Sequence, residues 1–159
     1  MQHVIVGGQS CYDGEAKGKQ MTPADLMRTV VKGLAANDMR PLMAVVDDNT
    51  VWKSAAGVGN PFRFGGEYRT RAGIADVTSN IFAAYTFLRF DAQEIVSEGE
   101  VVWGLFDVEC VYHTPKDRGG ADKPVRYECA LRWQVRNGML VEWQAFFDTL
   151  SVLRQQGEF

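Results

Sequence analysis

Hydrophobic residues in the first half of the chain recur at the spacing expected for helices. Three segments show this pattern, at residues 21–38, 39–48 and 70–85. Thr22 and Pro23 stand where the first of these helices would have its N-cap and its first turn. The positions expected to face a core in the first and third helices are Leu26, Val30, Leu34, Ile74, Val77 and Ile81. The first half of the chain therefore predicts three helices.

The second half of the chain predicts long strands joined by tight turns. Residues 87–114 read as two strands around a Glu-Gly turn, and residues 125–150 read as two more strands. The turn in the second pair is Asn137-Gly138, a dipeptide typical of two-residue hairpin loops. Four consecutive strands joined in this way form an antiparallel sheet.

The order of these elements indicates the fold class. A short strand is expected within residues 49–55, followed by a loop over 56–69 that is dense in Gly, Pro and Asn. Residues 1–20 show no clear period and are interpreted as an N-terminal arm, which leaves 21–159 as a single domain. Helices segregated from antiparallel strands are typical of an α+β domain, in which the three N-terminal helices pack on one face of the sheet.

One face of the predicted sheet mixes aromatic residues with acids and amides, and the other face is nearly all apolar. The mixed parity runs through Trp103, Leu105, Asp107, Glu109, Gln144, Phe146 and Asp148. The apolar parity runs through Phe106, Tyr112, Trp143 and Phe147. A strand side that faces solvent is normally plainly polar. The mixed face is therefore expected to line a partly polar cavity under the helices, and the apolar face to be buried against a second subunit.

Composition and charge narrow the range of partners. The chain has 159 residues, 46% hydrophobic and 23% charged, which is typical of one globular domain. The net charge is -3 and the basic residues are scattered, so neither a nucleic acid nor a membrane is an expected partner. Cys11, Cys110 and Cys129 are too few and too far apart for a disulfide framework, which favours a cytoplasmic protein. Neither His3 nor His113 has metal-ligand spacing, and no phosphate-binding loop occurs, so no metal and no cofactor are expected.

The order of elements and several loose motifs resemble the nuclear transport factor 2-like superfamily. The motifs are GGEYRTRAGI before the third helix, WQVRNGMLVEW in the last hairpin and the closing FFDTLSVLRQQG. Within the superfamily the chain is most similar to the SnoaL-type group of polyketide cyclases, ketosteroid isomerases and limonene-epoxide hydrolases, over roughly residues 20–157. The resemblance implies a cone-shaped α+β fold, usually dimeric, with three N-terminal helices on the concave face of a curved antiparallel sheet and a deep pocket between them.

The resemblance also implies candidate catalytic residues. In the epoxide-hydrolase branch two aspartates face each other across the pocket, and Asp107 and Asp148 match their positions. That branch has an Arg where this chain has Leu105, and a Tyr and an Asn where it has Trp52 and Ser54, so the water-activating set is incomplete. In polyketide cyclases of this type a lone pocket Asp is the acid/base, a role open to either aspartate.

The chemistry of such a pair leaves structural alternatives open. Two carboxylates in one apolar pocket repel each other and resist ionisation, which raises one pKa towards the range that acid/base catalysis needs. Asp148 would equally serve as a carboxylate that caps a short terminal turn, and Asp107 as a buried acid paired with Arg89 or Arg132. Glu109 either adds a second pocket acid or lies at the rim.

Two classes of function follow from these patterns. The first is a cofactor-independent isomerase, cyclase or hydratase that uses a pocket Asp on a small, largely apolar substrate. The second is a non-catalytic module of the same fold that binds a hydrophobic ligand or dimerises. A homodimer through the outer sheet face is expected in either case. The residues expected to contact the small molecule are Trp52, Tyr68, Trp103, Leu105, Glu109, Trp133, Gln144 and Phe146, whose aromatic members would also suit a core.

Overall fold

The computed structural model describes residues 21–55, 62 and 64–158, and shows an α+β fold. The predicted arm at 1–20 lies outside the described residues, as do residues 56–61 and 63 of the loop predicted at 56–69. The elements in chain order are α1 (Pro23–Ala35), α2 (Arg40–Met43), β1 (Val51–Ser54), β2 (Gly66–Arg69), α3 (Thr70–Ala84), β3 (Tyr85–Glu98), β4 (Val101–Tyr112), a 3-10 turn (Lys116–Arg118), β5 (Lys123–Arg136), β6 (Met139–Phe147) and α4 (Thr149–Gln156).

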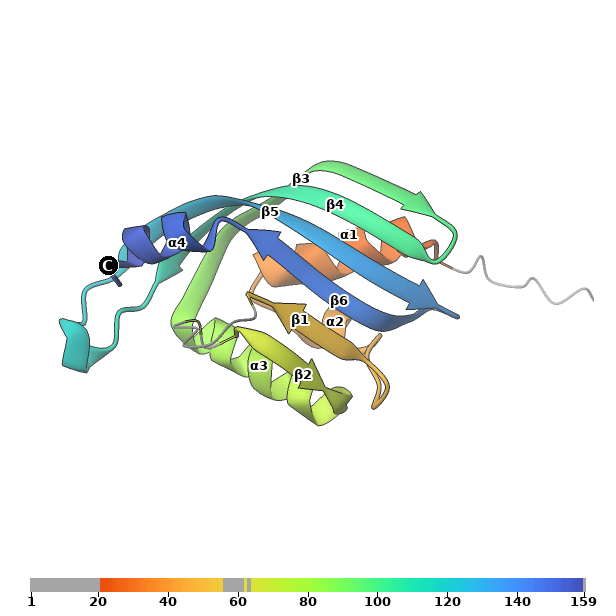
Figure 1. Ribbon diagram of the computed structural model, residues 1–159, viewed down its shortest axis with the longest axis horizontal. Coiled ribbons are helices and arrows are strands. Elements are labelled where there is room, and N and C mark those ends of the chain that lie inside the picture. The colour runs from red at the N-terminus through yellow and green to blue at the C-terminus, as the bar shows by residue number, and fades with distance from the viewer. Residues whose placement is uncertain (1–20, 56–61, 63, 159) are drawn as a thin grey trace, which may run out of the picture.

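The strands form one curved, six-stranded sheet in the order β2-β1-β6-β5-β4-β3, which arches over the helices in Figure 1. The long strands β3 to β6 are antiparallel neighbours, as the sequence predicts. β1 pairs with β6 in parallel and with β2 in antiparallel fashion, so the sheet is mixed rather than purely antiparallel. The prediction missed this pairing because β1 meets a strand about ninety residues later, with no local turn to signal it.

Irregularities in β3 accompany the curvature of the sheet. The register between β3 and β4 shifts between Phe87 and Arg89 and again between Ala92 and Glu94. Bulges of this kind bend a strand and increase its local twist. The turn between β5 and β6 has positive φ at both Asn137 and Gly138, which is the backbone that this dipeptide favours.

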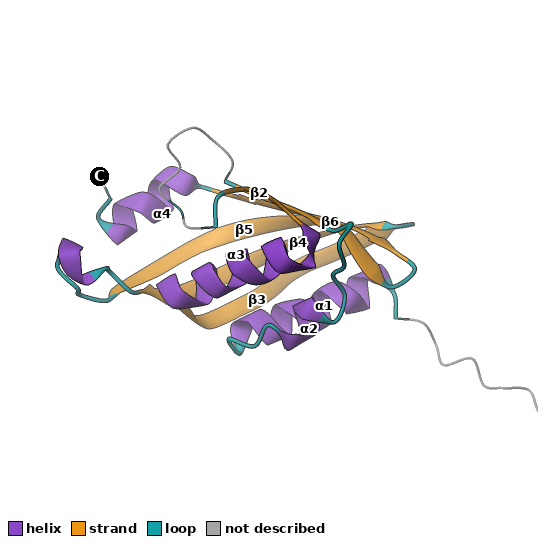
Figure 2. Ribbon diagram, turned by 90° about the horizontal axis from the view of Figure 1, so that it is seen from below, coloured by secondary structure: helices purple, strands orange, loops and turns teal. Residues whose placement is uncertain are grey.

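Helices α1, α2 and α3 lie on the concave face of the sheet, as predicted (Figure 2). α1 contacts β3 and β4, and α3 contacts β1, β2 and β3. The end of α1 is tied to the sheet by Asn37, whose side-chain amide donates to the carbonyl of Phe87 at 3.0 Å and accepts from its N–H at 2.9 Å. The core between helices and sheet includes the predicted inward positions Leu26, Val30, Leu34, Ile74, Val77 and Ile81.

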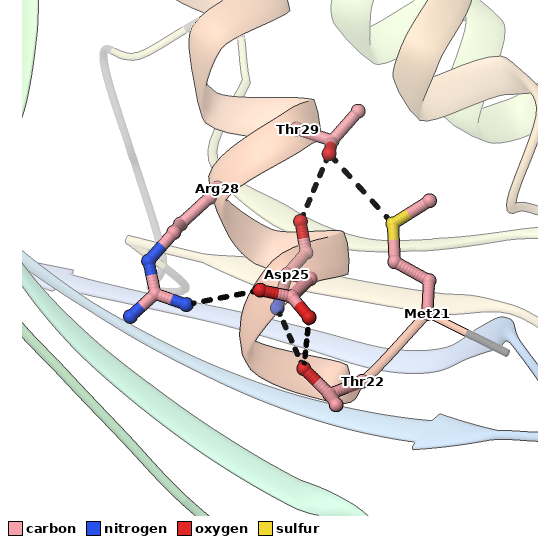
Figure 3. A network of polar contacts seen from close by, with 5 residues as sticks. All are labelled: Met21, Thr22, Asp25, Arg28 and Thr29. Carbon is pink, nitrogen blue, oxygen red and sulfur yellow. Dashed lines mark hydrogen bonds and ion pairs between the residues drawn. The ribbon is translucent and has the colours of Figure 1, made fainter. Parts of the chain in front are cut away.

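The start of α1 shows why the helix begins at Pro23. Thr22 is the N-cap, and its hydroxyl accepts from the N–H of Asp25 at 3.1 Å and donates to the Asp25 carboxylate at 2.7 Å (Figure 3). Arg28 lies one turn on, with its guanidinium 3.3 Å from the same carboxylate. Thr29 donates to the backbone carbonyl of Asp25 at 2.9 Å. A capping hydroxyl and an acid in the first turn each stabilise a helix N-terminus.

The C-terminal segment, interpreted from the sequence as a tail, contains the fourth helix. α4 packs against β5 and ends at Gly157, whose positive φ of 74° gives the left-handed backbone of a helix C-terminus. Val152, Leu153 and Gln156 are buried, so α4 belongs to the domain. In Figure 1 it lies at the end of the sheet where β6 stops.

Candidate functional site

The concave face of the sheet carries the apolar parity, which is the reverse of the prediction. In β4 the even-numbered residues from Val102 to Tyr112 are all buried, and the odd-numbered residues are exposed or half-buried. In β6 Trp143 is buried, whereas Gln144 and Phe146 face outwards. The prediction that the apolar face meets a second subunit is therefore wrong, because the helices of the same chain cover it.

A hollow of about 60 Å³ lies between the concave face and the helices. Its lining residues come from the sheet, from α1 and α3, and from the connection before β2. They are Leu34, Trp52, Ser54, Phe64, Ile81, Tyr85, Phe87, Phe90, Tyr127, Cys129, Leu131, Trp143, Ala145 and Phe147. This volume has room for a few water molecules, whereas a benzene ring occupies cavities of about 150 Å³. A larger guest therefore enters only when lining side chains shift.

The polar groups at the wall of the hollow are uncharged at neutral pH. Burial raises the pKa of Tyr85 and Tyr127 above the usual tyrosine value, and burial raises the pKa of the Cys129 thiol to about 12. The Tyr85 hydroxyl accepts a hydrogen bond from the side-chain amide of Gln156 in α4, which fixes its position. None of the lining residues that the structure describes has a carboxylate, imidazole, ammonium or guanidinium group. The described wall therefore holds no ionised base, and the surface that it turns to the hollow is almost wholly apolar.

Three tryptophans form a stack along one side of this face. Trp52 lies directly opposite Trp143 across β1 and β6, and Trp143 lies opposite Trp133 across β6 and β5. The ring centroids are 4.3 Å apart in the first pair and 4.7 Å apart in the second. Residues in direct register on one sheet face have neighbouring Cβ atoms, so the stack follows from the strand pairing. The indole N–H groups of all three are buried and have no acceptor among the described residues.

Asp107 lies on the convex face of the sheet, outside the hollow. Its carboxylate accepts from the side-chain amide of Gln93 at 2.7 Å, and the same amide lies 3.1 Å from a carboxylate oxygen of Glu128. Its cross-strand neighbours are Asp91 and Glu128, both exposed acids. No ion pair with Arg89 or Arg132, the sequence-based alternative, occurs for Asp107 among the described residues.

Asp148 is the N-cap of α4. Its carboxylate accepts from the N–H of Ser151 at 2.9 Å, and the residue is exposed. This is the capping role that the sequence left open. Neither aspartate is among the residues that line the hollow, so the prediction that they face each other across it is wrong. The physical reason for the error is the reversed parity of β4 together with the end of β6 at Phe147.

The other predicted contact residues divide between the two faces. Trp52 lines the hollow, and Trp133 is fully buried beside it in the stack. Tyr68 is half-buried in β2 and donates to the carbonyl of Gly65 at 3.2 Å. The remaining five residues lie on the convex face: Trp103, Leu105, Glu109, Gln144 and Phe146. Of these, Trp103 and Phe146 stack with centroids 5.9 Å apart and are 42% and 49% exposed.

The convex face also carries ion pairs that explain its acids. Glu109 accepts from Arg126 at 2.8 Å, so it belongs to this outer surface rather than to a pocket rim. Glu142 accepts from Lys53 and from Arg132, both at 2.7 Å. The hydrogen bond from Lys53, aided by both cations, holds the pKa of Glu142 below its usual value.

Several lining residues were missed from the sequence, notably Tyr85, Tyr127, Trp143 and Phe147. A signal existed for the last three, because every second residue is apolar along these stretches of β5 and β6. No such signal existed for Tyr85, because the alternation in β3 breaks at Arg89, where the register shifts. A strand face covered by helices has no contact with water and needs no polar residue.

Within the part of the chain that the structure describes, no group of three or more His, Cys, Asp or Glu side chains is placed to hold a metal ion. No described helix combines the length and the apolar character needed to cross a membrane. The described cysteines, Cys110 and Cys129, are both buried free thiols.

Known proteins share this architecture. The family model for the SnoaL-like domain matches residues 27–143. A candidate isomerase from Rhodopseudomonas palustris is 19% identical, with a TM-score of 0.69 over 84% of this chain and 94% of its own. A candidate polyketide cyclase from Streptomyces antibioticus is 20% identical, with a TM-score of 0.65 over 85% and 98%. TerC, crystallised with polyporic acid, is 18% identical, with a TM-score of 0.66 over 84% and 98%. A search of the curated proteins finds no match to this chain.

Proposed function

This chain belongs to the SnoaL-like domain family, and we propose that it binds a small, neutral, largely apolar molecule in the concave hollow. The observation that carries the proposal is the composition of the wall, which is made of aromatic and aliphatic side chains, has an almost wholly apolar surface and holds no charged group among the described residues. Small-molecule sites are typically lined predominantly by hydrophobic and aromatic side chains. The co-crystallisation of TerC with polyporic acid supports an organic molecule as the class of ligand.

Charge is the first selectivity expected of this site. Moving an ionised group from water into an apolar environment without a partner of opposite charge is strongly unfavourable. The described wall offers no such partner. A neutral aromatic molecule should therefore bind more tightly than its carboxylated analogue.

A pair of alanines tests the location of the binding site. Ala145 lines the hollow in β6, whereas Ala130 lies on the convex face of β5, opposite Phe146. Ala145→Leu puts extra carbon atoms into a space of about 60 Å³ and should weaken binding of a neutral aromatic probe. Ala130→Leu serves as the matched control. Titration followed by tryptophan fluorescence gives both affinities, because Trp52 and Trp143 line the hollow. Equal affinities in the two variants would refute this location.

The second candidate function is an acid/base enzyme of the isomerase, cyclase or hydratase type that acts on the same ligand. It is favoured by the relatives described as a candidate isomerase and a candidate polyketide cyclase. Asp107 and Asp148 lie outside the hollow, so in this version a group other than these two transfers the proton, and Asp107→Asn and Asp148→Asn should leave turnover unchanged. In the binding module no turnover is detected. A turnover assay on a panel of small carbonyl compounds separates the two candidates.

We also propose that the convex face pairs with a second copy of the chain. Trp103 and Phe146 form an exposed aromatic pair there, and the same face carries side chains of both charge signs, such as Asp107 and Arg126. Exposed aromatic patches with polar rims are typical of protein interfaces. Sedimentation at micromolar concentration should give a dimer, and Trp103→Glu should shift it to monomer. A wild-type monomer would overturn the proposal.

A further inference from the structure

Phe64 differs from the other described residues that line the hollow. Those residues belong to α1, α3, β1, β3, β5 or β6, where the backbone hydrogen bonds of a helix or a sheet fix their positions. Phe64 lies instead in the connection before β2, outside any helix or strand. The residue is buried all the same, with only 9% of its surface exposed. Its ring is therefore held in the wall by side-chain packing rather than by a regular backbone element.

The ring of Phe64 packs among other aromatic rings of the wall. Its centroid lies 5.8 Å from that of Tyr85 and 6.0 Å from that of Phe147, with interplanar angles of 67° and 42°. Phe62, from the same connection, has its centroid 5.1 Å from Phe64 and 5.5 Å from Phe147. Aromatic rings at such separations and tilts attract one another. The ring of a ligand would find the same partners in the place that the Phe64 ring occupies.

An open cleft adjoins the hollow near Phe147. The cleft has a volume of about 390 Å³, and Ser54, Ala145 and Phe147 line both the cleft and the hollow. The pairing of β1 with β6 ends at Ser54 and Ala145, so β1 does not cover β6 beyond this point. A molecule in the cleft would therefore reach the hollow at these residues, and the Phe64 ring packs on one of them.

We infer that Phe64 selects ligands by size: its ring occupies the place of a ligand's ring, and its side chain turns aside when a ligand binds. The inference rests on the proposed function, and it assigns uncharged molecules with more than one ring as the ligand class. The hollow alone, at about 60 Å³, is smaller than the cavities of about 150 Å³ that hold benzene. Displacement of a phenyl side chain frees the volume of one further ring. Two fused rings bury more apolar area than the phenyl ring they replace, which offsets the displacement.

Two truncations of opposite expected effect test this role. Phe87 lines the same hollow but lies in β3, with its ring 6.2 Å from Phe82 and 5.8 Å from Phe90. Phe87→Leu should weaken the binding of indane, a neutral two-ring hydrocarbon, because a shortened wall residue loses contacts with the ligand. Phe64→Leu should strengthen it, because less of a side chain has to be displaced. Titration followed by tryptophan fluorescence gives the affinities.

Phe64→Ala gives the size of the effect. Exposing a buried phenylalanine side chain to water is unfavourable, and indane no longer has to cause this exposure in the variant. The affinity for indane should therefore rise about 10–100-fold over that of the wild type. Phe146→Ala, which removes a ring from the convex face, should leave the affinity unchanged.

Fluorine spectra of wild-type protein labelled with 4-fluorophenylalanine follow the side chain itself. The chain has nine phenylalanines, and the two Leu variants assign the signals of Phe64 and Phe87. Exchange of H₂O for D₂O displaces the signal of an exposed fluorine atom more than that of a buried one. When indane binds, the Phe64 signal should become sensitive to this exchange, whereas the Phe87 signal should stay insensitive.

The outcomes separate this inference from the proposed function. Changes of affinity of the same sign in Phe64→Leu and Phe87→Leu would overturn it, as would a Phe64 signal that stays insensitive to solvent when indane is bound. Binding by Phe64→Ala but not by the wild type would overturn it too, because the ring would then be a fixed part of the wall. If indane binds to none of these proteins, the proposed function itself fails.

Discussion

Gly104 tests which face of the sheet is turned towards the helices. It lies in the middle of β4, among the even-numbered residues. The structure buries these residues under the helices, whereas the sequence analysis expected them to face away from the helices. A Cβ atom at this position would lie 2.4 Å from the ring of Phe106 and 2.8 Å from the sulphur of Met27 in α1. If the opposite face were the concave one, position 104 would face outwards and an added methyl group would meet no core atom. Gly104→Ala therefore has opposite consequences under the two arrangements.

The size of the effect follows from the room around the new methyl group. Both contacts are under 3.0 Å, and Phe106 and Met27 are fully buried, so neither can swing into solvent. Phe106 is held on its other side by Phe90, with ring centroids 5.3 Å apart. Overpacking of this kind costs about 1–3 kcal/mol. Alanine also restricts the unfolded chain more than glycine does, which stabilises the folded state by about 0.4–1 kcal/mol. We expect a net loss of about 1–2 kcal/mol, which lowers the Tm by about 2–8 °C in a domain of this size.

Thermal unfolding followed by circular dichroism measures this shift. The matched control is Gly73→Ala in α3, where the nearest heavy atoms to the added Cβ are 3.7 Å and 4.0 Å away. Alanine is a better helix former than glycine, so this control should keep or raise the Tm. A Gly104→Ala protein with an unchanged or raised Tm would refute the inward placement of this parity. The hollow would then lie on the other side of the sheet.

Three further predictions concern individual side chains. Asp148→Ala should lower the free energy of unfolding by about 1 kcal/mol, because α4 loses its N-cap. Asp148→Asn should unfold at nearly the wild-type denaturant midpoint, since asparagine also caps helices. Equal losses of stability in the two variants would contradict the capping role. A lysine hydrogen bond lowers the pKa of Glu142 in the folded state, so its contribution to stability is present above its ordinary value of 4.5 and disappears as the pH falls. The Tm of Glu142→Gln should therefore fall less than the wild-type Tm between about pH 5 and pH 3. An equal fall of Tm in both proteins would count against the ion pairs. In a Cys11→Ser background, Cys110 and Cys129 should react with a thiol reagent at pH 8 only after addition of denaturant. Both thiols are buried, and burial raises the pKa of each to about 12. Fast labelling of the native protein would contradict their burial.

Local signals predicted most of the fold. Thr22 and Pro23 begin α1 as expected, and Asn137-Gly138 forms the tight turn between β5 and β6. Each of these signals acts over a few residues, where backbone preference and side-chain capping determine the conformation. The parallel pairing of β1 with β6 was missed because it joins segments distant in sequence and depends on tertiary packing. α4 was missed because it is short, and short helices are stabilised mainly by the surface on which they pack.

The site was predicted less well than the fold because both faces of the sheet carry large aromatic residues. Trp103 and Phe146 look like core residues in the sequence, yet each is more than two-fifths exposed. Asp107 lies on the same face of the sheet as these two residues, so the sequence analysis placed it in the predicted pocket with them. Side-chain alternation fixes which residues share a face, but only the position of the helices decides which face is covered. The wholly apolar parity, with Phe106 and Trp143, was the better guide, because a dry face excludes acids more strictly than an outer face excludes aromatics.

The distribution of charge between the two faces restricts the chemistry that the hollow can support. On the convex face, Asp107 and Glu142 are half-exposed and find donors in Gln93, Lys53 and Arg132. There the carboxylates remain hydrated or paired, so ionisation costs little. In the hollow the same groups would lose water without gaining a cation, and an acid placed there would be held protonated. A neutral apolar molecule meets no such penalty, because it has no charge to desolvate. The hollow is therefore suited to hold such a molecule, whereas removal of a proton from the ligand would require a base from outside the described wall.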